Sequence, residues 1–324
     1  MSQEGRGKRD FARIDDLQAV HGRLLTWYAA NARDLPWRRT RDPYRILVSE
    51  VMLQQTQVER VVPAYEAFLA RFPTIEHLAA APLGEVIAAW GGLGYNRRAV
   101  YLWRAACEIV ERHRGVFPRD RRHLEQLPGV GRYTAGAVLC FAFAEPVAFW
   151  DTNIARVLTR VFLGPDCRPS RRDLDALAAW ALPHDRAYEW NQALMELGAR
   201  VCVNRRPRCE QCPLRAVCRS AGMTGSVRRR SERFAGSRRY YRGRIVAALR
   251  ARPQGLSLGA LRELVHDAGV AGGTIALEEL VAGLARDGLV EVHEERGEYI
   301  VRLPGQRGES APERSSGSAE GSLA

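Results

Sequence analysis

Apolar positions recur every three to four residues along most of the chain, which is the period of an amphipathic helix. The pattern runs over residues 11–221 and is seen, for example, at Leu17, Val20, Leu24 and Tyr28. Proline and glycine interrupt it at intervals, and no pair of alternating segments indicates strands there. We therefore predict a mainly α array of short helices, one of which covers Tyr44–Val62.

A second pattern occupies residues 239–303. Three segments with helical spacing are followed by two alternating segments around a short polar turn, which is a hairpin signal. These segments are Tyr240–Arg250, Leu258–His266, Thr274–Arg286, Leu289–His293 and Glu298–Arg302. The order predicts a small winged-helix-like α+β unit. Its third helix carries Glu278 and Glu279, so reading of a DNA groove by that helix is not supported.

Polar segments flank these two regions. Residues 1–10 and 304–324 read as disordered tails, and residues 222–238, rich in Gly, Ser and Arg, read as a linker. From Arg228 to Arg244 there are eight arginines and one acidic residue. This stretch is either a solvated tether or a strap that contacts phosphates.

The charge balance indicates a polyanionic partner. The chain of 324 residues has 49 Lys and Arg against 37 Asp and Glu, a net charge of +12, which favours nucleic acid. The N-terminal residues do not resemble a signal peptide and no apolar run reaches the length of a membrane span, so we expect a cytoplasmic protein. Lys8 is the only lysine, so Schiff-base chemistry would have to use a residue in the polar tail.

Four of the seven cysteines lie close together in the sequence. The cluster has the spacing C-x6-C-x2-C-x5-C and consists of Cys202, Cys209, Cys212 and Cys218. In an intracellular protein such thiolates are typical ligands of a metal or cluster. Zinc sites usually show two C-x2-C pairs, and only one is present, whereas four thiolates suit a [4Fe–4S] cluster. We predict the cluster, with zinc as the alternative, and expect the isolated Cys107, Cys140 and Cys167 to be small buried residues.

Two motifs carry a resemblance to a known family. The cysteine spacing after a helical region resembles the endonuclease III and adenine glycosylase superfamily of DNA repair enzymes, and Ser49–Gln57 (SEVMLQQTQ) resembles the adenine glycosylase (MutY family) signature almost letter for letter. The resemblance implies a two-lobed helix-hairpin-helix fold. It implies a cluster domain formed by residues 11–41 and 146–221, and a six-helix domain over 42–145.

Two carboxylates are candidates for acid and charge-stabilising roles. Glu50 lies at the edge of an apolar helix face, where partial desolvation raises the pKa of a carboxyl group. Asp151 precedes the predicted helix Thr152–Phe162, a typical N-cap position. Cleavage of an N-glycosidic bond needs a proton donor and a carboxylate near the developing sugar cation. The resemblance implies that Glu50 protonates the adenine, that Asp151 stabilises or traps the cation, and that Asn153 helps to hold Asp151.

Position 133 bears on the type of reaction. The resemblance implies that superfamily lyases have a lysine here, whereas this chain has Tyr133. We therefore predict base removal without efficient strand cleavage. In having a tyrosine at this position, the chain resembles some adenine glycosylases, where the tyrosine supports the aspartate. It also resembles the thymine/uracil–guanine mismatch glycosylases in this respect.

Further residues are candidates for contact with DNA. The glycines of Leu127–Gly131 (LPGVG) permit a tight turn before the predicted helix Arg132–Phe143, and this resembles the phosphate-binding helix-hairpin-helix. The resemblance assigns base-pocket or DNA contacts to Arg38, Leu53, Gln54, Gln55, Tyr95, Gly129 and Gly131. Among these, Gln55 and Tyr95 are expected to fill the duplex when the target base is flipped out.

The C-terminal unit is too short for the Nudix-like domain of the long adenine glycosylases. Three hypotheses follow: excision of adenine opposite 8-oxoguanine or guanine, excision of thymine or uracil opposite guanine, and a non-catalytic Fe–S protein that binds DNA. The signature around Glu50 favours the first. We expect a monomer that acts on double-stranded DNA with a mispaired adenine and has no membrane partner.

Overall fold

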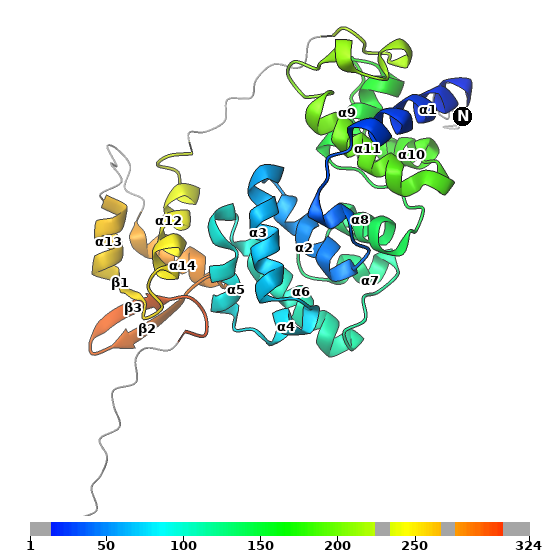
Figure 1. The fold of residues 1–324 in the computed structure, drawn as a ribbon. Helices are drawn as coiled ribbons and strands as arrows, with labels where there is room; N and C mark the ends of the chain where they lie inside the picture. The colour runs from blue at the N-terminus through cyan, green and yellow to red at the C-terminus, as the bar shows by residue number, and fades with distance from the viewer. Residues whose placement is uncertain (1–13, 224–233, 267–275, 307–324) are drawn as a thin grey trace, which may run out of the picture. The chain divides into compact units, whose positions relative to one another are not determined.

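The computed structural model describes residues 14–223, 234–266 and 276–306 (Figure 1). Packing divides the chain into two compact units: unit 1 contains residues up to Glu76 together with Arg104–Ser231, and unit 2 contains His77–Trp103 and the residues from Glu232 onward. This division places residues 77–103 with the C-terminal part, whereas the sequence grouped them within 42–145. The predicted domain boundaries therefore stay a prediction. The predicted tail at 1–10, residues 307–324 of the predicted tail 304–324, and the arginines at 228–230 lie outside the described residues. The tail prediction is wrong for Pro304, which is buried and accepts a hydrogen bond from Gly84 N at 2.8 Å.

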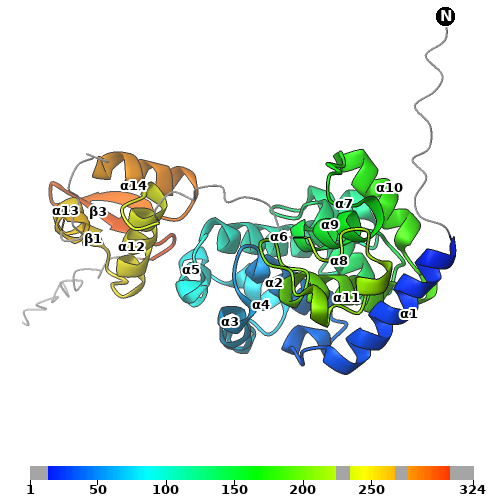
Figure 2. The ribbon, with the colours of Figure 1, turned by 90° about the horizontal axis from the view of Figure 1, so that it is seen from above.

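Unit 1 is built from helices, as predicted. Its helices are α1 (Ile14–Asn31), α2 (Pro43–Leu53), α3 (Val58–Arg71), α7 (Arg121–Gln126), α8 (Arg132–Phe143), α9 (Thr152–Leu158), α10 (Arg171–Ala181) and α11 (Ala187–Arg200), and α4 (Ile75–Ala80) and α6 (Arg97–His113) cross its limits. Figure 2 shows α1 running beside α11, and α2 packs on α8 while α9 packs on α11. The mainly α prediction is confirmed.

The core of unit 1 is formed by the predicted apolar faces. Fully buried side chains come from α1, α2, α3, α8 and α11, and include Leu24, Met52, Phe68, Val138 and Trp190. Of the isolated cysteines expected to be buried, Cys140 is buried, whereas Cys107 and Cys167 are half-buried.

The predicted continuous helix over Tyr44–Val62 is wrong, because α2 ends at Leu53 and α3 begins at Val58. Gln55 in the intervening turn has φ 56, a left-handed conformation that ends a helix. The apolar spacing did not show this break, since Val51 and Val58 are seven residues apart, about two helical turns. In a continuous helix the side chains of Gln54 and Gln55 would point in different directions around the helix. In the turn, both residues lie on the lining of one cleft.

Unit 2 contains the predicted C-terminal helices and hairpin. Its elements are α5 (Leu83–Ala89), the beginning of α6, α12 (Arg238–Arg250), β1 (Leu256–Ser257), α13 (Leu258–His266), α14 (Leu277–Arg286), β2 (Glu291–Glu295) and β3 (Glu298–Arg302). The antiparallel sheet has the order β1-β3-β2. The hairpin is confirmed, and the helix–strand–helix–helix–hairpin order is that of a winged helix. The two-residue β1 is too short to show an alternating pattern, so the sequence did not predict it.

None of the helices within the described ranges combines the length and apolar character needed to cross a lipid bilayer.

Candidate active site

A cleft of about 1200 Å³ in unit 1 gathers most of the candidate residues. They come from the short turn that ends at Arg38, from α2 and the turn after it, from the turn before α8 and the first residues of α8, and from the beginning of α9. The candidates on its lining are Arg38, Glu50, Leu53, Gln54, Gln55, Gly129, Gly131, Tyr133, Asp151 and Asn153. Folding thus brings together segments about one hundred residues apart. Tyr95 belongs to unit 2, and the four clustered cysteines are not on the lining.

Glu50 is enclosed at the base of this cleft by the buried face of α2. The residue is 3% exposed. Burial raises the pKa of its carboxyl group to about 7, the charge of Asp151 adds to the rise, and a hydrogen bond from Tyr133 and the charge of Arg38 oppose it. The carboxyl group therefore retains a proton near neutral pH, and it lies where a bound molecule could receive that proton.

Asp151 is held at the beginning of α9. Its Oδ1 accepts hydrogen bonds from the backbone N–H of Asn153 (2.9 Å) and Ile154 (2.8 Å), and Asn153 Nδ2 donates to Oδ2 (2.9 Å). Arg156 Nη2 in turn donates to Asn153 Oδ1 at 2.8 Å. The predicted N-cap is confirmed. These bonds fix the orientation of the Asp151 carboxyl group at the beginning of α9.

Tyr133 lies beside Glu50 and close enough to Asp151 to be affected by its charge. It is the second residue of α8, its ring packs edge-on against Phe149 at 5.5 Å between centroids, and its hydroxyl donates to Glu50. Burial and the charges of Glu50 and Asp151 raise the pKa of the Tyr133 hydroxyl well above its usual value. The hydroxyl therefore stays protonated and acts as a donor to the Glu50 carboxylate. The sulfur of Met195 lies 3.7 Å from the same hydroxyl.

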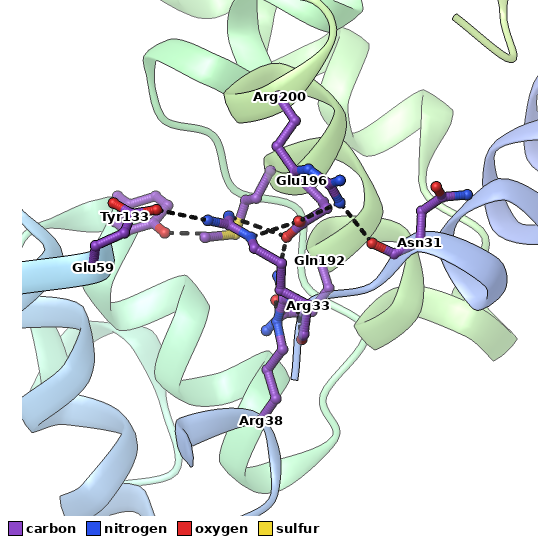
Figure 3. A network of polar contacts seen from close by, with 9 residues as sticks. Asn31, Arg33, Arg38, Glu59, Tyr133, Gln192, Glu196 and Arg200 are labelled. Carbon is purple, nitrogen blue, oxygen red and sulfur yellow. Dashed lines mark hydrogen bonds and ion pairs between the residues drawn. The ribbon is translucent and has the colours of Figure 1, made fainter. Parts of the chain in front are cut away.

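A buried ion-pair network forms another wall of the cleft (Figure 3). The Glu196 side chain has no exposed area and accepts hydrogen bonds from Arg33 Nε (2.7 Å) and Arg38 Nη2 (2.8 Å). Arg38 Nε also donates to Gln192 Oε1 at 2.9 Å. Although burial acts to raise it, the pKa of Glu196 is held below its usual value by hydrogen bonds from Arg33 and Arg38.

Sequence reasoning missed Glu196 and Gln192. The signal was present, because Gln192, Glu196 and Arg200 are spaced four apart on α11 and so share one helix face. The predicted pocket residue Arg38 belongs to this network, and Arg38 Nη1 donates to the Arg33 carbonyl at 2.9 Å. Trp37 is buried, as expected for a core residue.

The turn between α7 and α8 leaves its backbone open to close approach by a ligand. Gly129 has φ 76, a conformation that favours glycine, and Gly131 is the extended N-cap of α8. A Cβ atom added at Gly131 would meet nothing within 4 Å. The surface beside the first N–H groups of α8 is therefore open, and such N–H groups attract anions.

The two residues that are expected to fill the duplex, Gln55 and Tyr95, share an unusual backbone conformation. Gln55 has φ 56 and Tyr95 has φ 46, both in the left-handed region that is strained for residues other than glycine. Gln55 lies on the cleft lining with Leu53 and Gln54. Tyr95, in unit 2, follows Gly94 and has a side chain that is 40% exposed. Both are held in turns between helices.

The four clustered cysteines follow α11 in one irregular loop. All four are half-buried and unpaired by disulfides. Burial raises the pKa of the Cys212 thiol to about 11, and the other three thiols are close enough for their charges to add to the rise. Arg160 Nη1 donates to Cys202 Sγ at 3.4 Å. Among the described residues, no group of three or more Cys, His, Asp or Glu side chains is drawn together as tightly as a single metal ion requires.

The known proteins that this chain resembles in sequence and in structure are DNA repair enzymes. Residues 48–181 match the model of the HhH-GPD superfamily base excision DNA repair proteins. The adenine DNA glycosylase of Mycolicibacterium smegmatis is 50% identical over 232 residues, which are 70% of this chain and 79% of that protein.

Two solved structures share the fold. A thermostable thymine-DNA glycosylase is 32% identical with a TM-score of 0.59, covering 63% of this chain and 95% of its own. Endonuclease III in a non-covalent complex with DNA is 25% identical with a TM-score of 0.55, covering 63% and 96%. The mainly α helix-hairpin-helix prediction is confirmed by these matches.

Proposed function

Because the chain belongs to the adenine DNA glycosylase family, within the HhH-GPD superfamily, we propose that it removes adenine mispaired with 8-oxoguanine or guanine from double-stranded DNA. The observation that carries the proposal is the buried Glu50, which shares a cleft with Asp151, the N-cap of α9. A proton donor and a fixed anion are what hydrolysis of an N-glycosidic bond requires. The protein is thus a hydrolase of base excision repair.

The residues of the cleft perform the reaction in two stages. Glu50 gives its proton to a ring nitrogen of adenine, and the base leaves with the electron pair of the bond to the sugar carbon. Asp151, oriented by Asn153, stabilises or traps the positive charge that develops on the sugar. Water then adds its oxygen to the sugar carbon and releases a proton. Tyr133 supports Glu50 through its hydroxyl group.

DNA binding supplies the substrate geometry. The N–H groups at the beginning of α8, behind Gly129 and Gly131, bind a backbone phosphate. Gln55, beside Leu53 and Gln54, and separately Tyr95, fill the space left when adenine is flipped out of the stack. The net charge of +12 supports a polyanionic partner. We place the protein in the bacterial cytoplasm with the DNA, acting as a monomer.

The clustered cysteines fit a [4Fe–4S] cluster. Four thiols lie near one another in one loop, with Arg160 donating to Cys202 Sγ, and four thiolates are the ligand set that this cluster takes. Cys202, Cys209, Cys212 and Cys218 would hold it. The bound cluster would stabilise the loop and its surface toward DNA, and it has no part in hydrolysis. Broad visible absorption of the purified protein would support a cluster, and a colourless zinc-containing protein would contradict it.

The protein breaks the base–sugar bond without efficient cleavage of the strand. Strand cleavage by the lyase route needs an amine that forms a Schiff base with the sugar. The cleft lining has Tyr133 where such a lysine would lie, and no lysine is among the lining residues. The only lysine of the chain is Lys8.

A second candidate is excision of thymine or uracil opposite guanine. The 32% identity to a thymine-DNA glycosylase and the presence of Tyr133 favour it. The 50% identity to an adenine DNA glycosylase weighs more. A third candidate, a non-catalytic Fe–S protein, does not explain why a carboxyl group with a raised pKa is buried beside Asp151.

Single-turnover excision on four duplexes tests these candidates. The duplexes contain adenine opposite 8-oxoguanine, adenine opposite guanine, thymine opposite guanine and uracil opposite guanine, each analysed with and without hot alkali. Adenine loss with strand breaks only after alkali supports the proposal. Loss of only a pyrimidine opposite guanine would assign the protein to the mismatch group, and binding without excision of any base would support a non-catalytic role.

A further inference from the structure

Within unit 2, the C-terminal helices hold the segment that carries Tyr95. Arg239 Nη1, from the first turn of α12, donates a hydrogen bond to the Tyr95 hydroxyl at 2.7 Å, and its guanidinium lies 5.3 Å from the centre of the Tyr95 ring. One side chain therefore contacts both the polar and the aromatic part of Tyr95.

The two residues that follow Tyr95 are held as well. Arg250, near the end of α12, donates to Asn96 Oδ1 at 2.9 Å and to the Ile87 carbonyl at 3.0 Å. Asp287, just after α14, lies 3.4 Å from Arg97 Nε. Residues 95–97 thus each contact the C-terminal part of unit 2.

The Arg250 contact is a built-in feature of the fold rather than a surface contact. Burial of the Arg250 guanidinium lowers its pKa to about 10, and a buried charge of this kind is tolerated only where acceptors are in place. The backbone of α5 is tied down too, because Gly84 N donates to the Pro304 carbonyl at 2.8 Å. A Cβ atom at Gly84 would lie 2.5 Å from that carbonyl oxygen, so the packing there requires glycine.

These contacts explain how Tyr95 keeps a strained backbone. A tyrosine with φ 46 is stable only where its surroundings hold it in place. The side chain is 40% exposed, so core packing alone does not do this. Arg239 on α12 donates the hydrogen bond to the Tyr95 hydroxyl, and the guanidinium groups of Arg239 and Arg98 lie 5.3 and 5.5 Å from the ring centre, so these contacts restrict the side chain.

We propose that Arg239 is a positioning residue that orients Tyr95 for insertion into the DNA duplex, so that the winged-helix-like part acts in base flipping rather than in reading the groove. The proposal rests on the proposed function, in which Tyr95 fills the duplex. The chemical basis of the proposal is the contact between the Arg239 guanidinium and the Tyr95 side chain. The proposal does not require α12 to contact a base. It assigns to residues 238–303 a role in the excision reaction.

The test is a double-mutant cycle in the full chain with Arg239→Ala, Tyr95→Ala and the double variant. The matched control is Arg238→Ala, which removes the same charge from the same helix turn, where Arg238 pairs with Glu279 at 2.6 Å instead. Each protein is measured for single-turnover excision of adenine opposite 8-oxoguanine, for DNA affinity, and for the fluorescence of 2-aminopurine placed beside the mispair. The fluorescence reports unstacking whether or not a base is excised.

Arg239→Ala is expected to slow excision and reduce the fluorescence change by about tenfold, the order of one charged hydrogen bond, with affinity within about twofold. In the Tyr95→Ala background it should have no further effect, because its target is gone. Arg238→Ala should leave the fluorescence change of the bound duplex unchanged, and any loss of affinity that it shares with Arg239→Ala is the effect of the lost charge alone. Multiplicative effects of Arg239→Ala and Tyr95→Ala would overturn the proposal, since Arg239 would then act on DNA by itself. So would an unchanged fluorescence signal in Arg239→Ala.

Failure of the proposed function would have a different outcome. The unchanged protein would then excise no adenine from any duplex, while the fluorescence cycle would still report whether Arg239 and Tyr95 act together on the stack.

Discussion

The hydroxyl of Tyr133 donates a hydrogen bond to the carboxyl group of Glu50. Donation to the ionised form lowers the pKa of Glu50, while burial raises it more, to about 7. The two effects leave the carboxyl group poised near neutral pH, where an acid can both hold a proton and release it. A deeper pocket without the tyrosine would hold the proton too tightly for transfer.

Glu50→Gln is expected to abolish excision and retain binding of the mispaired duplex. The amide has nearly the same shape but no transferable acidic proton, so the loss should be about a thousandfold or more. Single-turnover excision and a binding titration measure the two properties. Glu66→Gln, at an exposed position on α3, is the matched control and should leave both unchanged. Normal excision by Glu50→Gln would show that another group is the acid.

The excision rate should depend on pH through the same carboxyl group. Below about pH 7 Glu50 is protonated and active as an acid. Above it, the rate of single-turnover excision should fall by about tenfold per pH unit, because only the protonated fraction donates. Binding measured at each pH separates loss of chemistry from loss of DNA affinity. A flat profile from pH 6 to pH 9 would contradict the assignment.

Burial of Glu50 should also be visible in stability. The pKa is raised from 4.5 to about 7 on folding, so ionisation disfavours the folded state increasingly from about pH 4.5 to pH 7 and by a constant amount above that. Glu50→Gln removes this cost. Its free energy of unfolding should exceed that of the unchanged protein by up to about 3 kcal/mol at pH 8, with the difference disappearing near pH 4.5. Urea unfolding at the two pH values measures this, and an equal difference at both would be the contrary result.

Local sequence signals predicted the parts of the fold that depend on local chemistry. The N-cap at Asp151 followed from the residue type and the helix after it, and the C-terminal hairpin followed from alternation. The break at Gln55 was missed because apolar periodicity continues through it. The left-handed residue at this break is a glutamine, so no glycine marks it in the sequence.

The candidate site shows the same limit. Glu50 and Tyr133 could be singled out from motifs. For Glu196 the four-residue spacing on α11 indicates only a shared helix face, and it does not identify the partners Arg33 and Arg38, which lie about 160 residues away. Likewise, the contact of Arg239 with Tyr95 joins positions 144 residues apart. Such pairs depend on the tertiary fold, which a single sequence does not reveal.

Glu196→Gln is expected to destabilise the protein by about 3 kcal/mol or more. It leaves the guanidinium groups of Arg33 and Arg38 facing a neutral amide where a carboxylate with no exposed area had paired with them. Chemical unfolding measures the loss. Glu189→Gln on the same helix is the control, because its pair with Arg186, at 3.7 Å, is exposed and should contribute less than about 1 kcal/mol. Equal effects of the two substitutions would mean that the buried network does not stabilise the cleft.

Tyr133→Lys tests the position that separates the two reaction types. The new amine would lie beside Glu50 and Asp151 on the cleft lining, where a sugar carbon reaches it if Asp151 faces the sugar. Borohydride should then trap a covalent complex with DNA, and strand breaks should appear without alkali. Tyr133→Phe is the control, since it also removes the hydroxyl but adds no amine, and should give neither product. Because Lys8 is the only native lysine, the unchanged protein provides a low background. If Tyr133→Lys still excises adenine but is not trapped, position 133 does not face the sugar, and the absence of a lysine there is not the reason that the strand stays intact.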